Sequence, residues 1–373
     1  MALKKLLHIT LDMNWGGLQR LVYDLVTDSL TRPRFSMHIC CLDRSGHYAN
    51  ELANLGVPTF IFHRRPVKID LRLLASLFRL MRRQSYDVVH SHSGCIFYAS
   101  LAAKLAGIRT VVHTEHGRYF PDKRTKILED RFCSYFLNHY VCVSHELIRY
   151  MLETVRVKPN KLKLIINGVD THRFHPYSPE KKRNLRFQLF GFESKMFVIG
   201  TVCRLQPIKN IEFLIKWAGE FFKDRSSIAI VVVGQGSEMD RLRQMSSSTP
   251  EGHILFTGAR DDIPDLLNTF DAFVSPSKSE GTSLTILEAM ASGLPVVVSD
   301  VGGNGKIVQH AMTGYLFPLN DGYCLTRAIT KLMEDLHLRA ALGKAARDAA
   351  VRNFDQNVMI SAYYKLYEKS VAA

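Results

Sequence analysis

Residues 272–299 read AFVSPSKSEGTSLTILEAMASGLPVVVS, with a short apolar run at each end, 272–275 and 296–299. Between these runs, apolar residues from Leu284 to Met290 recur at the three- and four-residue spacing of a buried helix face. A strand, a helix and a second strand in this order are typical of the crossover unit of a parallel sheet. This segment therefore predicts an α/β fold with parallel strands.

The same alternation extends over most of the chain. Apolar runs in the first half lie at 6–10, 37–42, 59–62, 88–91, 110–113 and 140–144, with helical patterns between most of them, for example at 18–30, 71–83, 96–106 and 125–137. A second series of runs lies at 197–202, 228–233, 254–256, 272–275, 296–299 and 315–317. Because a polar, proline-containing stretch follows Asp170, we predict two Rossmann-like, doubly wound domains that face each other across a cleft. Their bounds are 1–170 and 171–373, with a helical tail from about residue 321, and the last helix could cross back to the first domain.

Composition excludes several classes of protein. The 373 residues are 46% apolar and 23% charged and include no low-complexity tract, as in a globular protein. The longest apolar run, Ile228–Val233, is far shorter than the roughly 20 residues of a membrane-spanning helix. The seven cysteines include no C-x-x-C pair, which argues against a zinc site or a disulfide framework. The N-terminal apolar patch is too short for a signal peptide, so we expect a cytoplasmic protein.

The net charge of +14 is concentrated in the first half. Up to Asp170 the chain has 25 Lys and Arg against 14 Asp and Glu, whereas the remainder has 24 against 21. A basic surface can attract nucleic acid, an anionic membrane or a phosphorylated acceptor, and charge alone does not choose among these partners.

Two glutamates eight residues apart, Glu280 and Glu288, give the segment 275–295 its chemistry. The start of the helix, at Thr282, Ser283 and Leu284, offers N–H groups that could bind a phosphate together with the helix dipole. Glu288, two turns into the helix, could accept hydrogen bonds from ribose hydroxyls, and Glu280 could meet a sugar ring. For either glutamate alone, a solvated surface position explains the pattern equally well.

A second motif in the same half adds two cations. The stretch GTVCRLQPIKN, residues 200–210, places Arg204 and Lys209 just after a predicted strand, where they could neutralise a diphosphate leaving group. The chain has no D-x-D pair to hold a divalent metal. We therefore expect fixed cations in place of a metal, and no cofactor.

Taken together, these motifs resemble retaining glycosyltransferase family 4, which has the GT-B fold. The resemblance rests on E-G-x-S-L-x-x-L-E-A-M-A-x-G-x-P-V-V from Glu280, on G-x-V-x-R-L-x-x-x-K-N from Gly200 and on VVGQG at 232–236, and it extends over nearly the whole chain. It implies that the first domain binds the acceptor and the second a nucleotide-sugar, with UDP- or GDP-sugars favoured. It further implies that Glu280 contacts the donor sugar, Glu288 the ribose, and the Arg204 and Lys209 pair the diphosphate.

The first half contributes two further matches to this family. Gly16 and Gly17 follow the first strand and open a helix, where glycine permits close approach of a ligand to the backbone. The family has a Gly-Gly loop at this place. In HTEHGR, residues 113–118, the resemblance favours His116 over His113 as the histidine beside the reacting sugar, where it would contact a donor hydroxyl. One departure is Lys306, which stands where the family usually has glutamate.

The acceptor is the least defined part of the prediction. The resemblance suggests a glycan or lipid-linked acceptor in lipopolysaccharide, capsule or exopolysaccharide synthesis at the inner face of the plasma membrane. The basic amphipathic stretch 71–83, together with Arg64 and Arg65, could meet an anionic membrane surface, although its apolar stripe fits packing on the sheet better. A second aromatic and basic stretch, 119–124, follows His116.

Two other functions fit parts of the sequence. A sugar-nucleotide epimerase of the same fold would bind the donor but need no acceptor. A nucleic-acid-binding protein without enzymatic activity would explain the basic first half, but it would leave the four charged residues of the second half without a purpose. We therefore expect no nucleic-acid partner.

Overall fold

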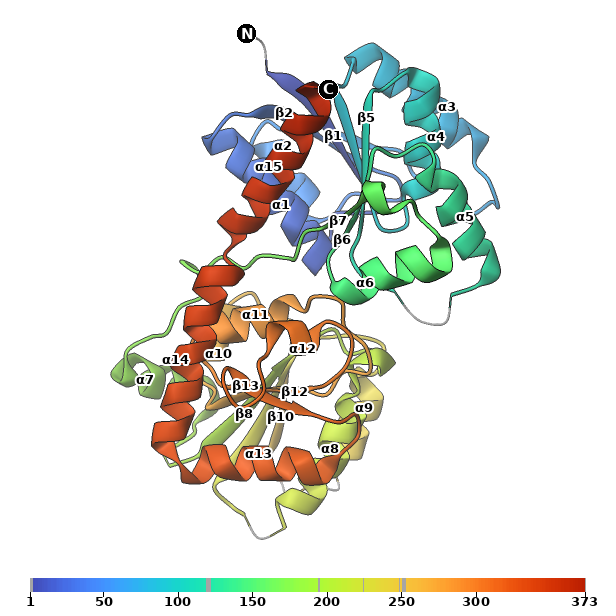
Figure 1. Ribbon diagram of the computed structural model, residues 1–373. Helices are drawn as coiled ribbons and strands as arrows, with labels where there is room; N and C mark the ends of the chain where they lie inside the picture. The colour runs from blue at the N-terminus through green and yellow to red at the C-terminus, as the bar shows by residue number, and fades with distance from the viewer. Residues whose placement is uncertain are drawn as a thin grey trace. The chain divides into compact units, whose positions relative to one another are not determined.

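The computed structural model describes residues 3–118, 122–193, 195–223, 225–247, 249 and 253–372. The chain divides into two compact units, one formed by residues 1–167 and 359–373 and the other by residues 168–358 (Figure 1). Residues 119–121 of the aromatic and basic stretch lie outside the described residues. None of the described helices combines the length and apolar composition that crossing a bilayer requires.

Unit 1 contains a seven-stranded sheet in which all neighbouring strands are parallel. Its strand order is β3 (Thr59–Ile61), β2 (Phe35–Cys41), β1 (Lys4–Thr10), β4 (Val88–His92), β5 (Thr110–Glu115), β6 (His139–Cys142) and β7 (Leu162–Leu164). Its helices are α1 (Gly17–Thr31), α2 (His47–Asn54), α3 (Leu71–Gln84), α4 (Ile96–Ala106), α5 (Arg124–Ser134), α6 (His145–Tyr150) and most of α15 (Gln356–Ala372). A π-helical turn over Met151–Val155 extends α6.

Helices cover both faces of this sheet, because alternate strand residues point to opposite sides. Leu7 of β1 belongs to the apolar core under α3, α4 and α5, whereas Leu6 belongs to the core under α1, α2 and α15. Three tyrosines of α15, Tyr363, Tyr364 and Tyr367, are buried in that second core. The C-terminal helix is therefore an integral layer of unit 1.

Unit 2 repeats the architecture with a six-stranded parallel sheet. Its strand order is β10 (Ile254–Gly258), β9 (Ile228–Val233), β8 (Phe197–Val202), β11 (Ala272–Ser275), β12 (Val296–Ser299) and β13 (Gly314–Phe317). Its helices are α7 (Pro179–Phe190), α8 (Ile211–Phe221), α9 (Met239–Ser246), α10 (Ile263–Asn268), α11 (Leu284–Ala291), α12 (Asn304–Ile307), α13 (Gly322–Glu334) and α14 (Leu336–Asn353). All six residues of β9 are buried, as expected for an apolar strand covered on both faces. The predicted fold class, two Rossmann-like doubly wound sheets with C-terminal helices, is confirmed.

Candidate active site

Both sheets have a topological switch point, where the chain changes direction across the sheet. In unit 1 it lies between β1 and β4, and in unit 2 between β8 and β11. Ligands of doubly wound folds bind beyond the carboxyl ends of the strands at such points. The loops that follow these four strands contain most of the residues that the sequence analysis selected.

In unit 2, the loop after β8 carries Arg204 and Lys209, and its path is fixed by two glycines of the neighbouring β9 loop. A Cβ on Gly234 or on Gly236 would collide with the backbone carbonyl oxygen of Cys203 or of Leu205. The Leu205 N–H also donates to the carbonyl oxygen of Gln235 at 3.0 Å. The two loops therefore pack backbone against backbone, which holds the Arg204 loop at the edge of the sheet.

The loop after β11 brings Glu280 to Lys209. The Lys209 ammonium lies 2.6 Å from Glu280 Oε1, and the Ser277 hydroxyl donates to the same oxygen at 2.7 Å. Both charged side chains are mostly withdrawn from solvent, with 24% and 9% of their side-chain surface exposed. The structure thus joins one of the two predicted cations to the first of the two predicted glutamates.

Asn210 connects these two loops, a role that the sequence analysis did not assign. It adopts a left-handed backbone conformation with φ of 57° and is buried. Its side-chain amide donates to the carbonyl oxygen of Pro276 at 3.0 Å and to Asn320 Oδ1 at 2.9 Å. The N–H of Lys278 donates to the carbonyl oxygen of Ile208 at 2.8 Å, so the loops are joined at two places. Asparagine tolerates left-handed geometry, which is the signal that could have selected it.

Helix α11 starts directly after the loop that carries Glu280. Ser283 occupies the N-cap position but its side chain makes no capping hydrogen bond; its hydroxyl lies 3.3 Å from Thr285 Oγ1. Thr282 and Ser283 are buried, and Leu284 and Glu288 are half-buried. A helix N-terminus that Ser283 does not cap, three residues after the Glu280 that holds Lys209, has the electrostatic character of a phosphate-binding site.

Lys306 lies on the short helix α12, behind the Glu280 loop. Its side chain is exposed, whereas the neighbouring Asn304 is buried and donates to the carbonyl oxygen of Ser299 at 2.9 Å. The Gly303 N–H donates to the carbonyl oxygen of Glu280 at 2.9 Å, which ties this segment to the candidate site.

In unit 1, Gly16 and Gly17 begin α1 directly after the β1 loop. Gly16 has extended backbone with φ of 170° and is the N-cap residue of the helix. The loop is anchored by Asp12, whose carboxylate accepts the Asn14 N–H at 3.0 Å. It also packs so closely on the next loop that a Cβ on Gly46 would meet the backbone of Asn14. The Gly-Gly turn is therefore held in place by its neighbours.

His116 follows β5 and joins a network of histidines that lies largely inside the sheet. Its Nε2 lies 3.0 Å from His92 Nδ1, and His92 Nε2 lies 3.1 Å from His8 Nδ1. Burial lowers the pKa of His116 and that of His8 to about 3, so both rings are neutral at pH 7. His113, in contrast, points to Ser91 Oγ at 2.9 Å and packs against Tyr140. Sequence reasoning missed the other members of this network, which come from β1 and β4.

A buried ion cluster supports the segment after His116. The Arg118 guanidinium lies 2.9 Å from Glu115 and 2.5 Å from Asp122, and it also contacts Asp130. Lys126 reaches Asp130 at 2.8 Å. Only 4% of the Arg118 side chain is exposed. This arginine therefore belongs to the scaffold of the loop, in which its charge is matched by carboxylates.

Two family models match the chain. Residues 15–173 match the model of glycosyltransferase family 4, and residues 182–349 match the model of glycosyl transferases group 1. Over 366 residues the chain is 30% identical to UDP-Gal:alpha-D-GlcNAc-diphosphoundecaprenol alpha-1,3-galactosyltransferase of Escherichia coli, covering 94% of this chain and 93% of that protein. It is 26% identical over 341 residues to N,N'-diacetylbacillosaminyl-diphospho-undecaprenol alpha-1,3-N-acetylgalactosaminyltransferase of Campylobacter jejuni, covering 87% and 89%.

Solved structures share the fold. HepE from Anabaena, crystallised with UDP and glucose, superposes with a TM-score of 0.86 at 23% identity, covering 98% of this chain and 99% of that one. WaaG, a glycosyltransferase of lipopolysaccharide biosynthesis, superposes with a TM-score of 0.73 at 15% identity, covering 97% and 99%. At these identities the likeness establishes the GT-B fold.

Proposed function

The chain belongs to glycosyltransferase family 4, a retaining family, and we propose that it transfers a hexose from a UDP-sugar to a lipid-linked saccharide in bacterial surface-polysaccharide synthesis. The observation that carries this proposal is the pairing of Lys209 with Glu280, shortly before the α11 N-terminus and at the switch point of unit 2, where the loop after β8 also carries Arg204. The choice of UDP and of a lipid-linked acceptor is supported by the E. coli relative, whose name states both.

Unit 2 has the groups that a nucleotide-sugar requires. Arg204, Lys209 and the first turn of α11 would hold the diphosphate, and Glu288 would accept hydrogen bonds from the ribose. The Lys209 ammonium has three N–H donors, so it can keep one bond to Glu280 and still reach a phosphate oxygen. Glu280 would then lie beside the donor sugar, with its charge balanced by the same lysine.

The transfer breaks the bond between the anomeric carbon and the β-phosphate oxygen and forms a bond from that carbon to the acceptor oxygen. The acceptor hydroxyl attacks from the face that the nucleotide leaves, and the departing phosphate takes its proton. The two cations stabilise the charge that develops on the diphosphate, so positioning and electrostatics supply the rate enhancement. Family 4 enzymes generally need no metal, and we expect activity in EDTA.

In unit 1, we assign His116 a contact with a hydroxyl of the transferred sugar. Gly16 and Gly17 would let the substrate approach the start of α1 closely. The predicted cleft between the domains stays a prediction.

The acceptor proposal changes one expectation about the membrane surface. The apolar stripe of α3 is core: Leu73, Leu77 and Met81 are buried, so this stripe is not available to lipid. An exposed apolar stripe lies on α5 instead, where Leu128 and Phe132, together with Tyr135 just after the helix, recur at spacings of four and three residues. Their exposed fractions of 60%, 51% and 62% make this the stronger candidate for contact with a bilayer.

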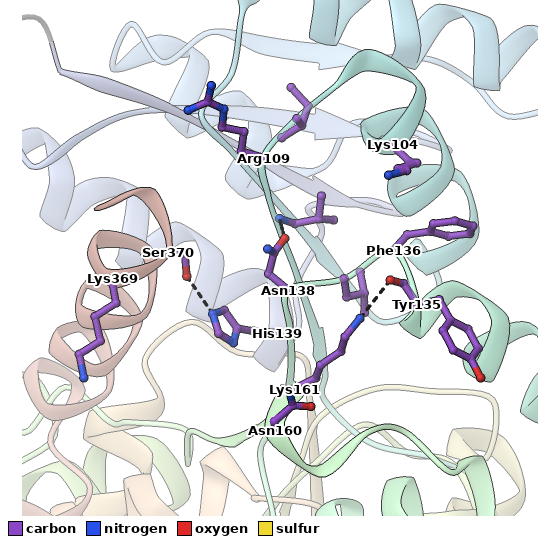
Figure 2. A pocket seen from close by; sticks show the side chains of 13 residues that line it. Lys104, Arg109, Tyr135, Phe136, Asn138, His139, Asn160, Lys161, Lys369 and Ser370 are labelled. Atoms are coloured by element: carbon purple, nitrogen blue, oxygen red, sulfur yellow. Dashed lines mark hydrogen bonds between the residues drawn. The ribbon is translucent and has the colours of Figure 1, made fainter. Parts of the chain in front are cut away.

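Cations lie beside this stripe. A hollow of about 670 Å³ at the amino ends of β5 and β6 is lined by Tyr135 and by four basic side chains, and none of the described residues that line it carries a carboxylate (Figure 2). The four cations are Lys104, Arg109, Lys161 and Lys369. An apolar stripe next to a basic hollow suits a surface of anionic lipid. We therefore propose that unit 1 docks at the inner leaflet through α5, and that the protein is cytoplasmic and peripheral.

Vesicle binding tests this placement. The fraction of protein that sediments with phosphatidylglycerol-containing vesicles should fall at least several-fold in a Leu128→Ser, Phe132→Ser double variant. An Arg72→Glu, Arg79→Glu variant on α3 should change only the electrostatic, salt-dependent part of vesicle binding. Equal binding by wild type and the α5 variant would remove α5 from the proposal.

The function itself is tested by a donor screen. Thermal shifts with UDP-, GDP-, ADP- and TDP-sugars in EDTA should identify UDP, because a ligand that binds the native state stabilises it. Turnover of UDP-galactose should then require a diphosphoundecaprenol-linked saccharide, and the product should keep the α configuration in NMR. Conversion of the donor without an acceptor would indicate an epimerase, and no shift with any nucleotide-sugar would overturn the assigned donor site.

A further inference from the structure

Three imidazoles form a hydrogen-bonded row across three neighbouring strands of unit 1. His8 lies on β1, His92 ends β4 and His116 follows β5. The row is joined by two contacts, His8 Nδ1 to His92 Nε2 at 3.1 Å and His92 Nδ1 to His116 Nε2 at 3.0 Å. His8 and His92 are fully buried, and His116 is half-buried. The row therefore runs from the interior of the sheet to the candidate active site.

The row couples the protonation of its three rings. A neutral imidazole carries one proton, so one ring nitrogen donates and the other accepts. If His92 donates from Nδ1 to His116, its Nε2 must accept from His8, and the proton of His116 is on Nδ1. If His92 donates from Nε2 to His8, its Nδ1 must accept from His116, and the proton of His116 is on Nε2. All three rings must adopt the same tautomer.

The buried end of the row distinguishes these two arrangements. His8 Nε2 is buried and has no hydrogen-bond partner among the residues that the structure describes. In the first arrangement this atom carries a lone pair, and in the second it carries an N–H group. A buried N–H without an acceptor is the rarer and more costly defect, so the first arrangement is favoured. Because His8 Nε2 has no partner in the described part of the chain, the row also cannot pass a proton on toward the interior of the sheet.

We propose that His8 and His92 are positioning residues that hold His116 in the Nδ1–H tautomer, so that it presents a hydrogen-bond donor to the substrate. His116 is half-buried, and its Nδ1 has no hydrogen-bond partner among the residues that the structure describes, so this nitrogen is left for a ligand. The inference rests on the proposed function, in which His116 contacts the sugar donor. Under it, His116 donates to a substrate oxygen and does not act as a base.

A metal site is the competing interpretation of this cluster, because His8, His90 and His92 place ring nitrogens within 4.8 Å of one another. Five of their six nitrogens already have protein partners. His90 contacts Tyr367 Oη and Thr114 Oγ1, both at 2.7 Å, and the row accounts for the other three. A metal would have to break several of these bonds, so the geometry favours the tautomer lock.

The first test reads the tautomer without any substrate. Long-range ¹H–¹⁵N correlation spectra of protein labelled with ¹⁵N-histidine, at pH 7 in EDTA, distinguish Nδ1–H from Nε2–H in each ring. The His116 signals are identified by their loss in His116→Gln. We expect Nδ1–H for His8, His92 and His116. An Nε2–H form of His116 would overturn the proposal even if the protein proves to be a glycosyltransferase.

The second test removes the lock. In His92→Phe we expect His116 to lose its single tautomer and kcat to fall about 10- to 100-fold, the range expected for one hydrogen bond to a charged or developing transition state. KM for the donor should change less. In His92→Asn, whose amide can still donate to His116 Nε2, most of the loss should be recovered.

His113→Leu is the matched control, because it removes another fully buried imidazole of the same unit that lies outside the row. It should destabilise the fold without changing the His116 tautomer. Should His92→Phe fail to fold, the wild-type spectrum still decides. Wild-type activity and an unchanged His116 tautomer in His92→Phe would refute the lock, and stoichiometric metal in the purified protein would support the competing interpretation.

Discussion

The two switch points share a topology but differ in chemistry. The unit 1 site is made of neutral imidazoles, two of them fully buried and His116 half-buried, whereas the unit 2 site is made of charged side chains near a helix N-terminus. Neutral rings suit contacts with sugar hydroxyls, and cations suit a diphosphate. Two copies of one fold therefore offer different ligand chemistry at the same topological position, one uncharged and the other charged.

The largest expected difference between the two units is in their stability to acid. A histidine whose pKa in the folded state lies below its unfolded value of about 6.5 does not reduce the free energy of unfolding above pH 6.5. As the pH falls from about 6.5 toward the folded-state pKa, the unfolded state binds a proton that the folded state does not, and the free energy of unfolding decreases. Because His8 and His116 have a pKa of about 3, each should lower the free energy of unfolding by about 2 kcal/mol when the pH falls from 7 to 5. Burial also lowers the pKa of His90, His92 and His113. Unit 1 should therefore open first in acid.

Hydrogen exchange followed by mass spectrometry measures this difference peptide by peptide. Between pH 7 and 5, after correction for the intrinsic exchange rate, peptides from β1, β4 and β5 should lose protection before peptides from β8 and β9. A His8→Phe variant should reduce the slope of stability against pH in unit 1. Parallel loss of protection in both units would contradict the acid sensitivity that the lowered histidine pKa values predict for unit 1.

The second largest expected effect is the loss of activity when a cation of the unit 2 site is removed. We expect Lys209→Met to lower kcat/KM by about 10²- to 10³-fold, because it removes a fixed charge at the leaving group and leaves the Glu280 carboxylate without its ion-pair partner. Lys306→Met, at an exposed lysine of the same unit, is the matched control and should cost less than 10-fold. If both variants lose activity equally, general charge attraction, rather than the Lys209 contact, would explain the effect.

The backbone packing that places Arg204 gives a third prediction. Gly234→Ala sets a Cβ against the Cys203 carbonyl in a left-handed conformation with φ of +133°, so the loop must move. We expect about 2 to 3 kcal/mol of lost stability and weaker UDP binding. Gly258→Ala, with φ of +76° but open space around its Cβ, should cost about 1 kcal/mol and leave UDP binding unchanged. Thermal melts and UDP titrations on the two variants measure the difference.

The same contrast explains what the sequence could predict. The unit 2 motif is local: Glu280, Ser283 and Glu288 lie within nine residues, and the buried strands on either side form continuous apolar runs. Periodicity therefore placed β8, β9, β11 and β12 with their observed bounds. The contact between Lys209 and Glu280 required the three-dimensional neighbourhood of β8 and β11, because the two residues are 71 positions apart.

The unit 1 site was harder to predict because its residues come from separate strands. His8, His92 and His116 lie far apart in the sequence, and only strand order and side-chain direction bring them together. The short strand β7 was missed because its sequence LKL is too brief to display a period. The π-helical turn after α6 was missed as well, since the pattern of apolar residues does not distinguish it from an α-helix.

The smallest expected difference between the units is the change in the free energy of unfolding when a helix N-cap residue is replaced. In unit 1 the Asp70 carboxylate caps α3, accepting from the Arg72 and Leu73 N–H groups at 3.1 Å, whereas Ser283 of unit 2 makes no side-chain capping bond to α11. Asp70→Ala should therefore cost about 1 to 2 kcal/mol in urea unfolding, and Ser283→Ala less than about 0.5 kcal/mol. A binding role for the α11 N-terminus predicts the opposite order for the midpoint shift caused by UDP, which should shrink in Ser283→Ala and persist in Asp70→Ala. A cost of 1 kcal/mol or more for Ser283→Ala without UDP would mean that the helix is capped by its own serine, and that α11 is less suited to a phosphate than its geometry indicates.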